Sequence, residues 1–174
     1  SAGYIALVIG ASYATKKLPL LKLQQLCKKI NFPIVLVGGP EDAKEGDAVA
    51  AIDPIKIYNA CGKFSLNESA SIVQKSRLVI SHDTGLQYIA CAFNKPVLAI
   101  WGSTSPMLQV EPYYGEANIA AMGLSMPPYQ NFIVPHLTCQ PCSNYGTKKC
   151  PKGHFNCMML QDTTAIAAAV EKYL

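Results

Sequence analysis

Residues 78–106 read LVISHDTGLQYIACAFNKPVLAIWGSTSP. The stretch begins with a short apolar run, Leu78 to Ser81, and a polar turn, His82 to Gly85. Apolar residues then recur at helical spacing as far as Phe93, and a second apolar run covers Val97 to Trp101. This order predicts a strand, a tight turn, a helix and a parallel strand. The turn would lie at the amino end of the helix, where unpaired backbone N–H groups and the helix dipole favour a phosphate or another anion.

The remaining sequence repeats this alternation. Further apolar runs predict strands at Tyr4 to Ile9, Ile34 to Val37, Ile57 to Ala60 and Asn118 to Met122. Helices are expected from Pro19 to Ile30, from Glu41 onward, from a Ser65–Glu68 capping box to Gln74, and from Thr163 to Tyr173 after an Asp162 cap. The Pro- and Cys-rich segment 127–157 reads as irregular. The pattern predicts an α/β fold, with a doubly wound, mostly parallel Rossmann-like sheet covered by helices on both faces.

Length and composition are consistent with one such domain over residues 1–174, because half of the 174 residues are hydrophobic. The formal net charge of +4 is spread over scattered lysines, which suits anionic ligands without indicating nucleic-acid binding. No apolar run approaches the roughly 18 residues of a membrane span, and the amino end lacks a signal-peptide pattern. Ser1 and Ala2 run almost directly into the first strand, which predicts an excised domain.

Four candidate site segments fall at the carboxyl ends of predicted strands, where ligands of such sheets bind. They are Gly10-Ala11-Ser12, Gly38-Gly39-Pro40-Glu41, Gly62-Lys63-Phe64 and Asp83-Thr84-Gly85. Any one of them is explained by the glycine that a connecting turn needs. Together they offer hydroxyls, carboxylates and open backbone, and Lys16 adds a mobile positive charge. This set suits a nucleotide diphosphate that carries a sugar.

These segments also carry a resemblance to a known family. The motifs are Gly10-Ala11-Ser12 with Lys16, Val35 to Gly39, Gly62 to Glu68, Asp83 to Leu86 and Trp101 to Pro106. In this order they resemble the carboxyl-terminal domain of glycosyltransferase family nine, the ADP-heptose:lipopolysaccharide heptosyltransferases and their relatives. The resemblance covers nearly the whole chain.

The resemblance implies a GT-B arrangement of two facing Rossmann-like domains, of which this chain is the donor-binding half and the acceptor domain is absent. It implies catalytic roles for Lys16 and Asp83, with Lys16 neutralising charge on the departing ADP. The donor-binding residues carried over by position are Ala11, Ser12, Lys16, Glu41, Phe64, Asp83, Thr84, Gly85 and Tyr88. Phe64 would contact adenine, and Glu41 would meet donor hydroxyls.

The implied reaction is inverting transfer of a heptose-like sugar from an ADP-sugar to lipopolysaccharide or a related glycan. It requires a general base and stabilisation of the leaving diphosphate. The family's proposed base lies in the other domain, so the fragment alone is expected to bind donor with little or no turnover. No cofactor, metal or nucleic acid is implied. The lipid-linked acceptor would be met at the cytoplasmic face of the bacterial inner membrane, where positive charge favours peripheral contact.

Two residues depart from the family pattern or stand apart from it. Tyr88 occupies the position where the family usually has histidine, and a phenol stays neutral near pH 7, which allows a shifted sugar preference. His82 lies at a predicted strand end and is interpreted as a structural residue. Trp101, Tyr113, Tyr114 and Tyr129 fit either the interdomain cleft or the core.

The seven cysteines divide into two groups. Cys27, Cys61 and Cys91 lie in apolar elements and are predicted to be core residues. Cys139, Cys142, Cys150 and Cys157 share one loop with His154, and zinc binding, packing thiols and disulfides all remain open for them.

Two other function classes are weighed against the transferase. A non-enzymatic, zinc-stabilised interaction module would bind metal but no nucleotide. A relative of the UDP-sugar epimerases would prefer uridine. Dinucleotide-dependent oxidoreductases and P-loop enzymes are disfavoured, because Gly10 to Thr15 matches neither glycine-rich motif.

Overall fold

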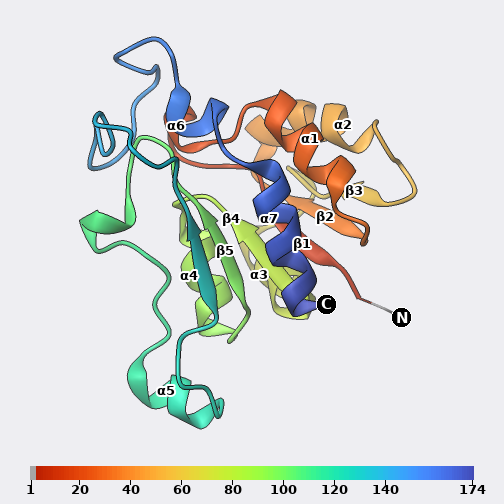
Figure 1. Cartoon of the computed structure of the whole chain (residues 1–174). Coiled ribbons are helices and arrows are strands. Elements are labelled where there is room, and N and C mark those ends of the chain that lie inside the picture. The colour runs from red at the N-terminus through yellow and green to blue at the C-terminus, as the bar shows by residue number, and fades with distance from the viewer. Residues whose placement is uncertain (1–2) are drawn as a thin grey trace.

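A computed structural model describes residues 3–174 and shows one six-stranded sheet (Figure 1). The strands are β1 (Ile5–Val8), β2 (Ile34–Val37), β3 (Ile57–Asn59), β4 (Leu78–Ser81), β5 (Val97–Ile100) and β6 (Tyr129–Phe132). Their order is β3-β2-β1-β4-β5-β6, and each neighbouring pair is parallel. The predicted doubly wound α/β fold is confirmed.

Helices fill the crossovers between the strands. The α-helices are α1 (Leu20–Lys29), α2 (Ala43–Ala50), α3 (Leu66–Lys75), α4 (Gly85–Ala92), α5 (Glu116–Ala121), α6 (Asn156–Met159) and α7 (Thr163–Val170). Short 3-10 turns are η1 (Ala14–Lys16), η2 (Pro40–Asp42), η3 (Pro106–Leu108) and η4 (Glu171–Tyr173). None of the helices in residues 3–174 has the length and apolar character needed to span a bilayer.

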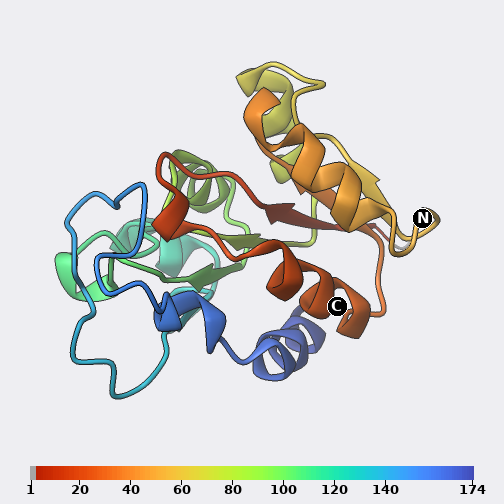
Figure 2. The same ribbon diagram turned by 90° about the horizontal axis from the view of Figure 1, so that it is seen from above.

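Successive side chains along each strand point to opposite faces of the sheet, so each face has its own hydrophobic core. On β1, Ile5 and Leu7 pack with side chains of α1, α2, α6 and α7. Ala6 and Val8 face the other way and pack with side chains of α3, α4 and α5. Figure 2 shows α1 and α7 side by side on one face. Strands buried on both faces explain the continuous apolar runs in the sequence.

The edge beyond β5 differs from the sequence prediction. The prediction of a strand at 118–122 is wrong, because this segment belongs to α5. This helix packs Ile119 against the core that contains Ala6 and Val8. Ile119 is the one β-branched residue in this segment, and Ala120 and Ala121 favour a helix over a strand. The sixth strand is β6, inside the segment predicted to be irregular. Its Gln130 and Asn131 are polar because β6 is an edge strand and only partly buried.

Both predicted caps are present. Ser65 N donates to Glu68 Oε2 at 2.8 Å, while Glu68 N donates to Ser65 Oγ at 3.3 Å. The Ser65 N–H lowers the pKa of the Glu68 carboxyl. Asp162 Oδ1 accepts from the amides of Thr164 and Ala165, both at 3.0 Å.

Asp162→Ala is expected to lower the free energy of unfolding by about 1 kcal/mol, because two amides at the start of α7 lose their acceptor. Urea denaturation measures the change. Asp162→Ser keeps an acceptor and should lose less than half as much, so equal losses in the two variants would contradict the capping role.

The topology creates one crevice at the carboxyl edge of the sheet. From β1 the chain crosses to β2 on one side, whereas β4 is followed by β5 on the other side. The turns after β1 and β4 therefore diverge, and a ligand can enter between them. This edge carries the segments that the sequence indicated as a site.

Candidate functional site

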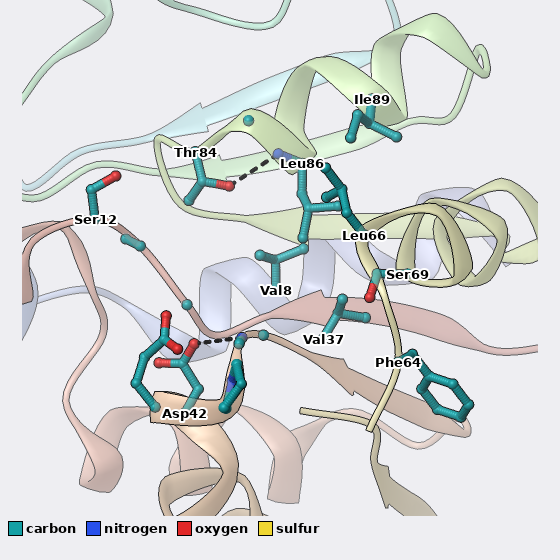
Figure 3. A pocket seen from close by; sticks show the side chains of 17 residues that line it. Val8, Ser12, Val37, Asp42, Phe64, Leu66, Ser69, Thr84, Leu86 and Ile89 are labelled. Atoms are coloured by element: carbon teal, nitrogen blue, oxygen red, sulfur yellow. Dashed lines mark hydrogen bonds between the residues drawn. The ribbon is translucent and has the colours of Figure 1, made fainter. Parts of the chain in front are cut away.

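A pocket of about 500 Å³ opens at this crevice (Figure 3). Its lining comes from four strand ends that are far apart in sequence: Val8 and residues 10–12, residues 37–42, Phe64, Leu66 and Ser69, and residues 84–86 with Ile89. All four predicted strand-end segments thus contribute. The parallel sheet gathers them because its strands share one carboxyl edge.

The pocket has a polar end and an apolar end. Figure 3 shows Ser12 and Thr84 at one end and Phe64 at the other, with Leu66 and further apolar side chains between them. Phe64 is 41% exposed, so its ring remains free to cover a ligand. An elongated ligand with a flat apolar group and an anionic group matches this division.

The polar end includes the start of α4. Thr84 Oγ1 caps the helix by accepting from Leu86 N at 3.2 Å. Outside the chain neighbours and the backbone of α4, no atom of residues 3–174 lies within 4 Å of the place where a Gly85 Cβ would stand, so a ligand can approach this backbone. Helix amides and a hydroxyl at this point form a favourable site for a phosphate oxygen.

Asp42 holds two of the glycine turns together. Its carboxylate is 2% exposed, accepts from Gly39 N at 2.9 Å and pairs with Lys17 Nζ at 2.7 Å. A Cβ on Gly10 would lie 2.4 Å from Asp42 Oδ2, and one on Gly38 would lie 2.8 Å away. The two glycines are therefore required by the close approach of this carboxylate.

Lys17 lies between Asp42 and Glu45, whose Oε2 is 3.2 Å from its ammonium nitrogen. Burial lowers the pKa of Lys17, but hydrogen bonds and charge from Asp42 and Glu45 outweigh it and raise the pKa. The ammonium stays charged throughout the physiological range. Sequence analysis missed Asp42, although an acidic residue in the first turn after a Gly-Gly-Pro turn is a recognisable capping signal.

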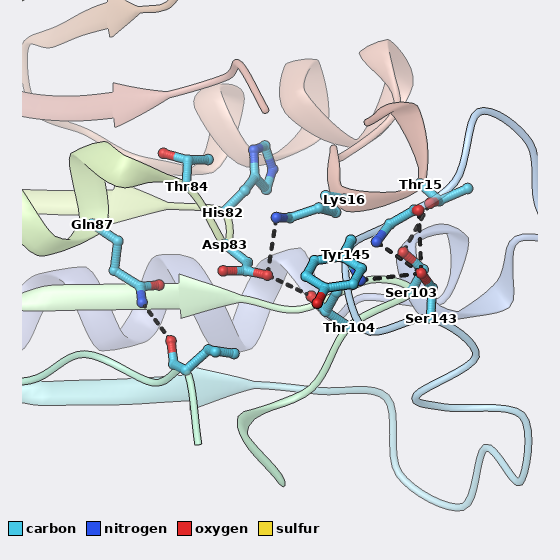
Figure 4. A network of polar contacts seen from close by, with 12 residues as sticks. Thr15, Lys16, His82, Asp83, Thr84, Gln87, Ser103, Thr104, Ser143 and Tyr145 are labelled. Carbon is cyan, nitrogen blue, oxygen red and sulfur yellow. Dashed lines mark hydrogen bonds and ion pairs between the residues drawn. The ribbon is translucent and has the colours of Figure 1, made fainter. Parts of the chain in front are cut away.

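Lys16 and Asp83 form a second ion pair beside the pocket (Figure 4). Lys16 Nζ lies 3.0 Å from Asp83 Oδ2, and the two side chains are only 11% and 13% exposed. Thr104 Oγ1 donates to the same carboxylate oxygen at 2.9 Å. Figure 4 shows Thr84 close to this pair, so the pair adjoins the polar end of the pocket.

The predicted donor-binding residues thus fall into three places. Ala11, Ser12, Glu41, Phe64, Thr84 and Gly85 line the pocket. Lys16 and Asp83 adjoin it as an ion pair. Tyr88 lies further along α4 and lines a separate pocket, and its hydroxyl donates to Val110 O at 2.7 Å.

His82 is buried beneath the site and bonds to the loop that follows Lys17. It is 1% exposed, and its Nε2 accepts from Leu18 N at 3.0 Å. Nδ1 then carries the proton and has no well-aligned acceptor. Burial lowers the pKa of His82 to about 4, and the Gly10 carbonyl only partly opposes this. The interpretation as a structural residue fits a neutral imidazole that fixes the loop carrying Lys16 and Lys17.

The depressed pKa predicts a pH effect on stability. The unfolded chain binds a proton near pH 6.5 while folded His82 does not, so His82 makes the protein less stable as pH falls from 6.5 towards 4. The difference in unfolding free energy between wild type and His82→Asn should shrink by roughly 2 kcal/mol from pH 7 to pH 5. Urea titrations at both pH values measure it, and a constant difference would contradict a neutral buried histidine.

The aromatic residues lie partly in the core and partly at the surface. Trp101 is fully buried and donates from its indole to Asn131 Oδ1 at 2.9 Å, so it is a core residue. Tyr114 is buried and stacks with Tyr129, whereas Tyr113 is 74% exposed.

Cys27, Cys61 and Cys91 are buried as predicted, and burial raises the pKa of Cys27 and of Cys61 to about 12. Cys157 also packs into the core, where burial and then the nearby thiols of Cys142, Cys150 and Cys139 raise its pKa to about 11. Within residues 3–174, no group of three or more His, Cys, Asp and Glu side chains is arranged to hold a metal ion.

Comparisons with known proteins identify the family of the chain. The family model described as glycosyltransferase family 9 (heptosyltransferase) matches residues 1–132. Lipooligosaccharide heptosyltransferase 2 of Haemophilus influenzae is 30% identical over 89 residues, which cover 49% of this chain and 26% of that protein.

Two solved structures share the fold. Escherichia coli ADP-heptose lipopolysaccharide heptosyltransferase II superposes with a TM-score of 0.71 at 16% identity over 99% of this chain and 46% of that chain. The E. coli heptosyltransferase WaaC, solved with ADP, gives a TM-score of 0.67 at 17% identity over 99% of this chain and 45% of that one. The chain therefore spans less than half the length of these relatives. The family model covers three quarters of the sequence, so the chain belongs to glycosyltransferase family 9.

Proposed function

We propose that residues 1–174 form the donor-binding half of an inverting glycosyltransferase, which moves a heptose-like sugar from an ADP-sugar to lipopolysaccharide or a related glycan. The observation that carries this proposal is a pocket with an apolar end at Phe64 and an anion-binding end at Thr84, next to the Lys16–Asp83 ion pair. The adenine, the diphosphate and the sugar of the donor would lie in this order from Phe64 through Thr84 to the ion pair.

The lining residues support this orientation. Adenine would lie at the Phe64 and Leu66 end, where it removes apolar surface from water. Glu41 lines the same pocket and can accept from ribose hydroxyls. The diphosphate would accept from Ser12, Thr84 and the first amides of α4.

The ion pair supplies the groups that the reaction needs beyond the pocket. As the bond from the sugar to the diphosphate breaks, negative charge grows on the leaving ADP, and Lys16 can neutralise it. Asp83 can accept from a sugar hydroxyl and hold the anomeric carbon in place. The general base that takes the acceptor's proton would come from the other half of the enzyme.

Membership of family 9 and the named activities of the relatives support a role in lipopolysaccharide synthesis. One of the solved relatives holds ADP. We infer a cytoplasmic site of action at the inner face of the bacterial inner membrane, with a lipid-linked acceptor bound by the other domain. Tyr88 in place of the family's histidine leaves the identity of the sugar open to a shift.

Transfer is tested with the protein that contains this chain and its acceptor half, supplied with ADP-heptose and a deacylated lipopolysaccharide core. We expect release of ADP and a glycoside whose anomeric configuration, measured by NMR, is opposite to that of the donor. Retained configuration would contradict the inverting mechanism, and transfer from UDP-sugars alone would contradict the donor.

A further inference from the structure

The cysteine-rich segment after β6 is the part of the sequence that the proposed function does not use. It forms loops beyond the carboxyl ends of the strands, and part of it is hydrogen-bonded to neighbouring loops (Figure 2). The amides of Cys142 and Ser143 both donate to Ser103 O, at 3.0 and 3.2 Å. Gln140 Nε2 donates to Gly102 O at 2.7 Å. These bonds fix the segment to the loop that follows β5.

The next turn of this segment is bonded to the loop that carries Lys16. Thr147 N donates to Thr15 Oγ1 at 2.8 Å, and Thr15 N donates to Thr147 O at 3.2 Å. Thr15 Oγ1 also lies 2.8 Å from Ser103 Oγ. Thr15 is 3% exposed, so the residue next to Lys16 is fixed in a buried polar cluster.

Gly146 brings this turn against the Lys16 side chain itself. Its φ of +100° is a conformation that favours glycine, and Ser143 Oγ accepts from its amide at 2.9 Å. A Cβ on Gly146 would lie 2.7 Å from Tyr13 Cβ, 2.8 Å from Lys16 Cδ and 3.0 Å from Lys16 Cγ. The backbone of Gly146 therefore packs directly against the methylene groups of the Lys16 side chain.

We propose that the turn Cys142–Thr147 is a positioning element for Lys16, a role that rests on the proposed function of this lysine. A lysine side chain has four flexible bonds, and fixing it costs conformational entropy. Contact with the Gly146 backbone excludes conformers of the Lys16 side chain in which the ammonium group turns away from Asp83. Lys16 is thus already directed to the diphosphate end of the pocket before the ligand arrives.

Calorimetric titration of the chain with ADP and with adenosine tests this role, because only ADP carries the diphosphate that Lys16 would meet. Lys16→Ala should weaken ADP binding about tenfold or more and leave adenosine unchanged. Gly146→Ala should weaken ADP binding at least about fivefold with adenosine unchanged, because the new methyl group displaces Lys16 together with Tyr13 in the same loop. In the Lys16→Ala background, Gly146→Ala should cause no further loss.

Gly153→Ala is the matched control. Gly153 lies in the same segment with φ +79°, and in the described part of the chain nothing beyond its chain neighbours lies within 4 Å of a Cβ there. This variant therefore adds backbone strain of the same kind without touching Lys16. It should bind ADP as the wild type does. Thr15→Val and Thr15→Ser form a second pair, in which valine should lower ADP affinity and serine should restore it, and this pair decides the matter if Gly146→Ala does not fold.

The outcomes separate the two claims. Equal losses in Gly146→Ala and Gly153→Ala, or a Gly146→Ala loss that persists without Lys16, would overturn the positioning role alone. An ADP affinity that is unchanged in Lys16→Ala would overturn the function proposed for the lysine, and the positioning role with it.

Discussion

Lys16→Ala is expected to lower the rate of sugar transfer by about two to three orders of magnitude in the protein that contains both halves of the enzyme. Removal of one preorganised group that stabilises developing charge typically has an effect of this size. Lys16 is nearly buried and held 3.0 Å from Asp83, so its charge acts where water screens it weakly. Most of the loss should appear in kcat, because charge on the leaving ADP grows mainly in the transition state.

Steady-state release of ADP measures this change. Lys28→Ala is the control. Lys28 is an exposed lysine in the last turn of α1, and it does not line the pocket. This variant removes the same formal charge and should leave kcat within twofold. A Lys16→Ala enzyme that keeps kcat within fivefold of wild type would exclude the lysine from charge stabilisation.

Asp42→Ala should have the largest effect on stability among the polar residues of the site, about 2–4 kcal/mol. The carboxylate is 2% exposed, and its loss leaves the Gly39 amide without an acceptor and Lys17 with only Glu45. The cavity left between Gly10 and Gly38 would also loosen the walls of the nucleotide pocket.

Urea denaturation followed by Trp101 fluorescence suits this measurement, because the only tryptophan is fully buried. Asp42→Asn keeps an acceptor for Gly39 but loses the charge opposite Lys17, so it should fall between wild type and Asp42→Ala. Glu45→Gln, which alters only the outer partner of Lys17, should cost less than about 1 kcal/mol. Equal stability of Asp42→Ala and Glu45→Gln would contradict the role of the buried carboxylate.

The fold was predictable where burial and local chemistry agree. The runs that became β1, β2, β4 and β5 are apolar on both faces because helices cover both sides of the sheet. The Ser65 and Asp162 caps are short-range patterns. β6 was missed because an edge strand needs little burial, and its polar residues carry no periodic signal.

The sequence predicted which turns form the site, but not which side chains within them pair with one another. Parallel strands place their carboxyl ends together, so the segments at Ser12, Glu41, Phe64 and Thr84 had to meet at one edge. The sequence could not show that Lys16 pairs with Asp83, or that Thr15 bonds to Thr147, because such contacts join residues far apart along the chain. Partners of this kind depend on the packing of loops, which local propensity does not encode.

Calorimetric titration of the chain with ADP, set beside UDP, tests the central claim most directly. The account predicts saturable ADP binding at one site, with UDP at least about tenfold weaker because a pyrimidine covers less of the apolar end at Phe64. Folded protein that binds neither nucleotide, or that binds UDP more tightly than ADP, would contradict a donor site for an ADP-sugar.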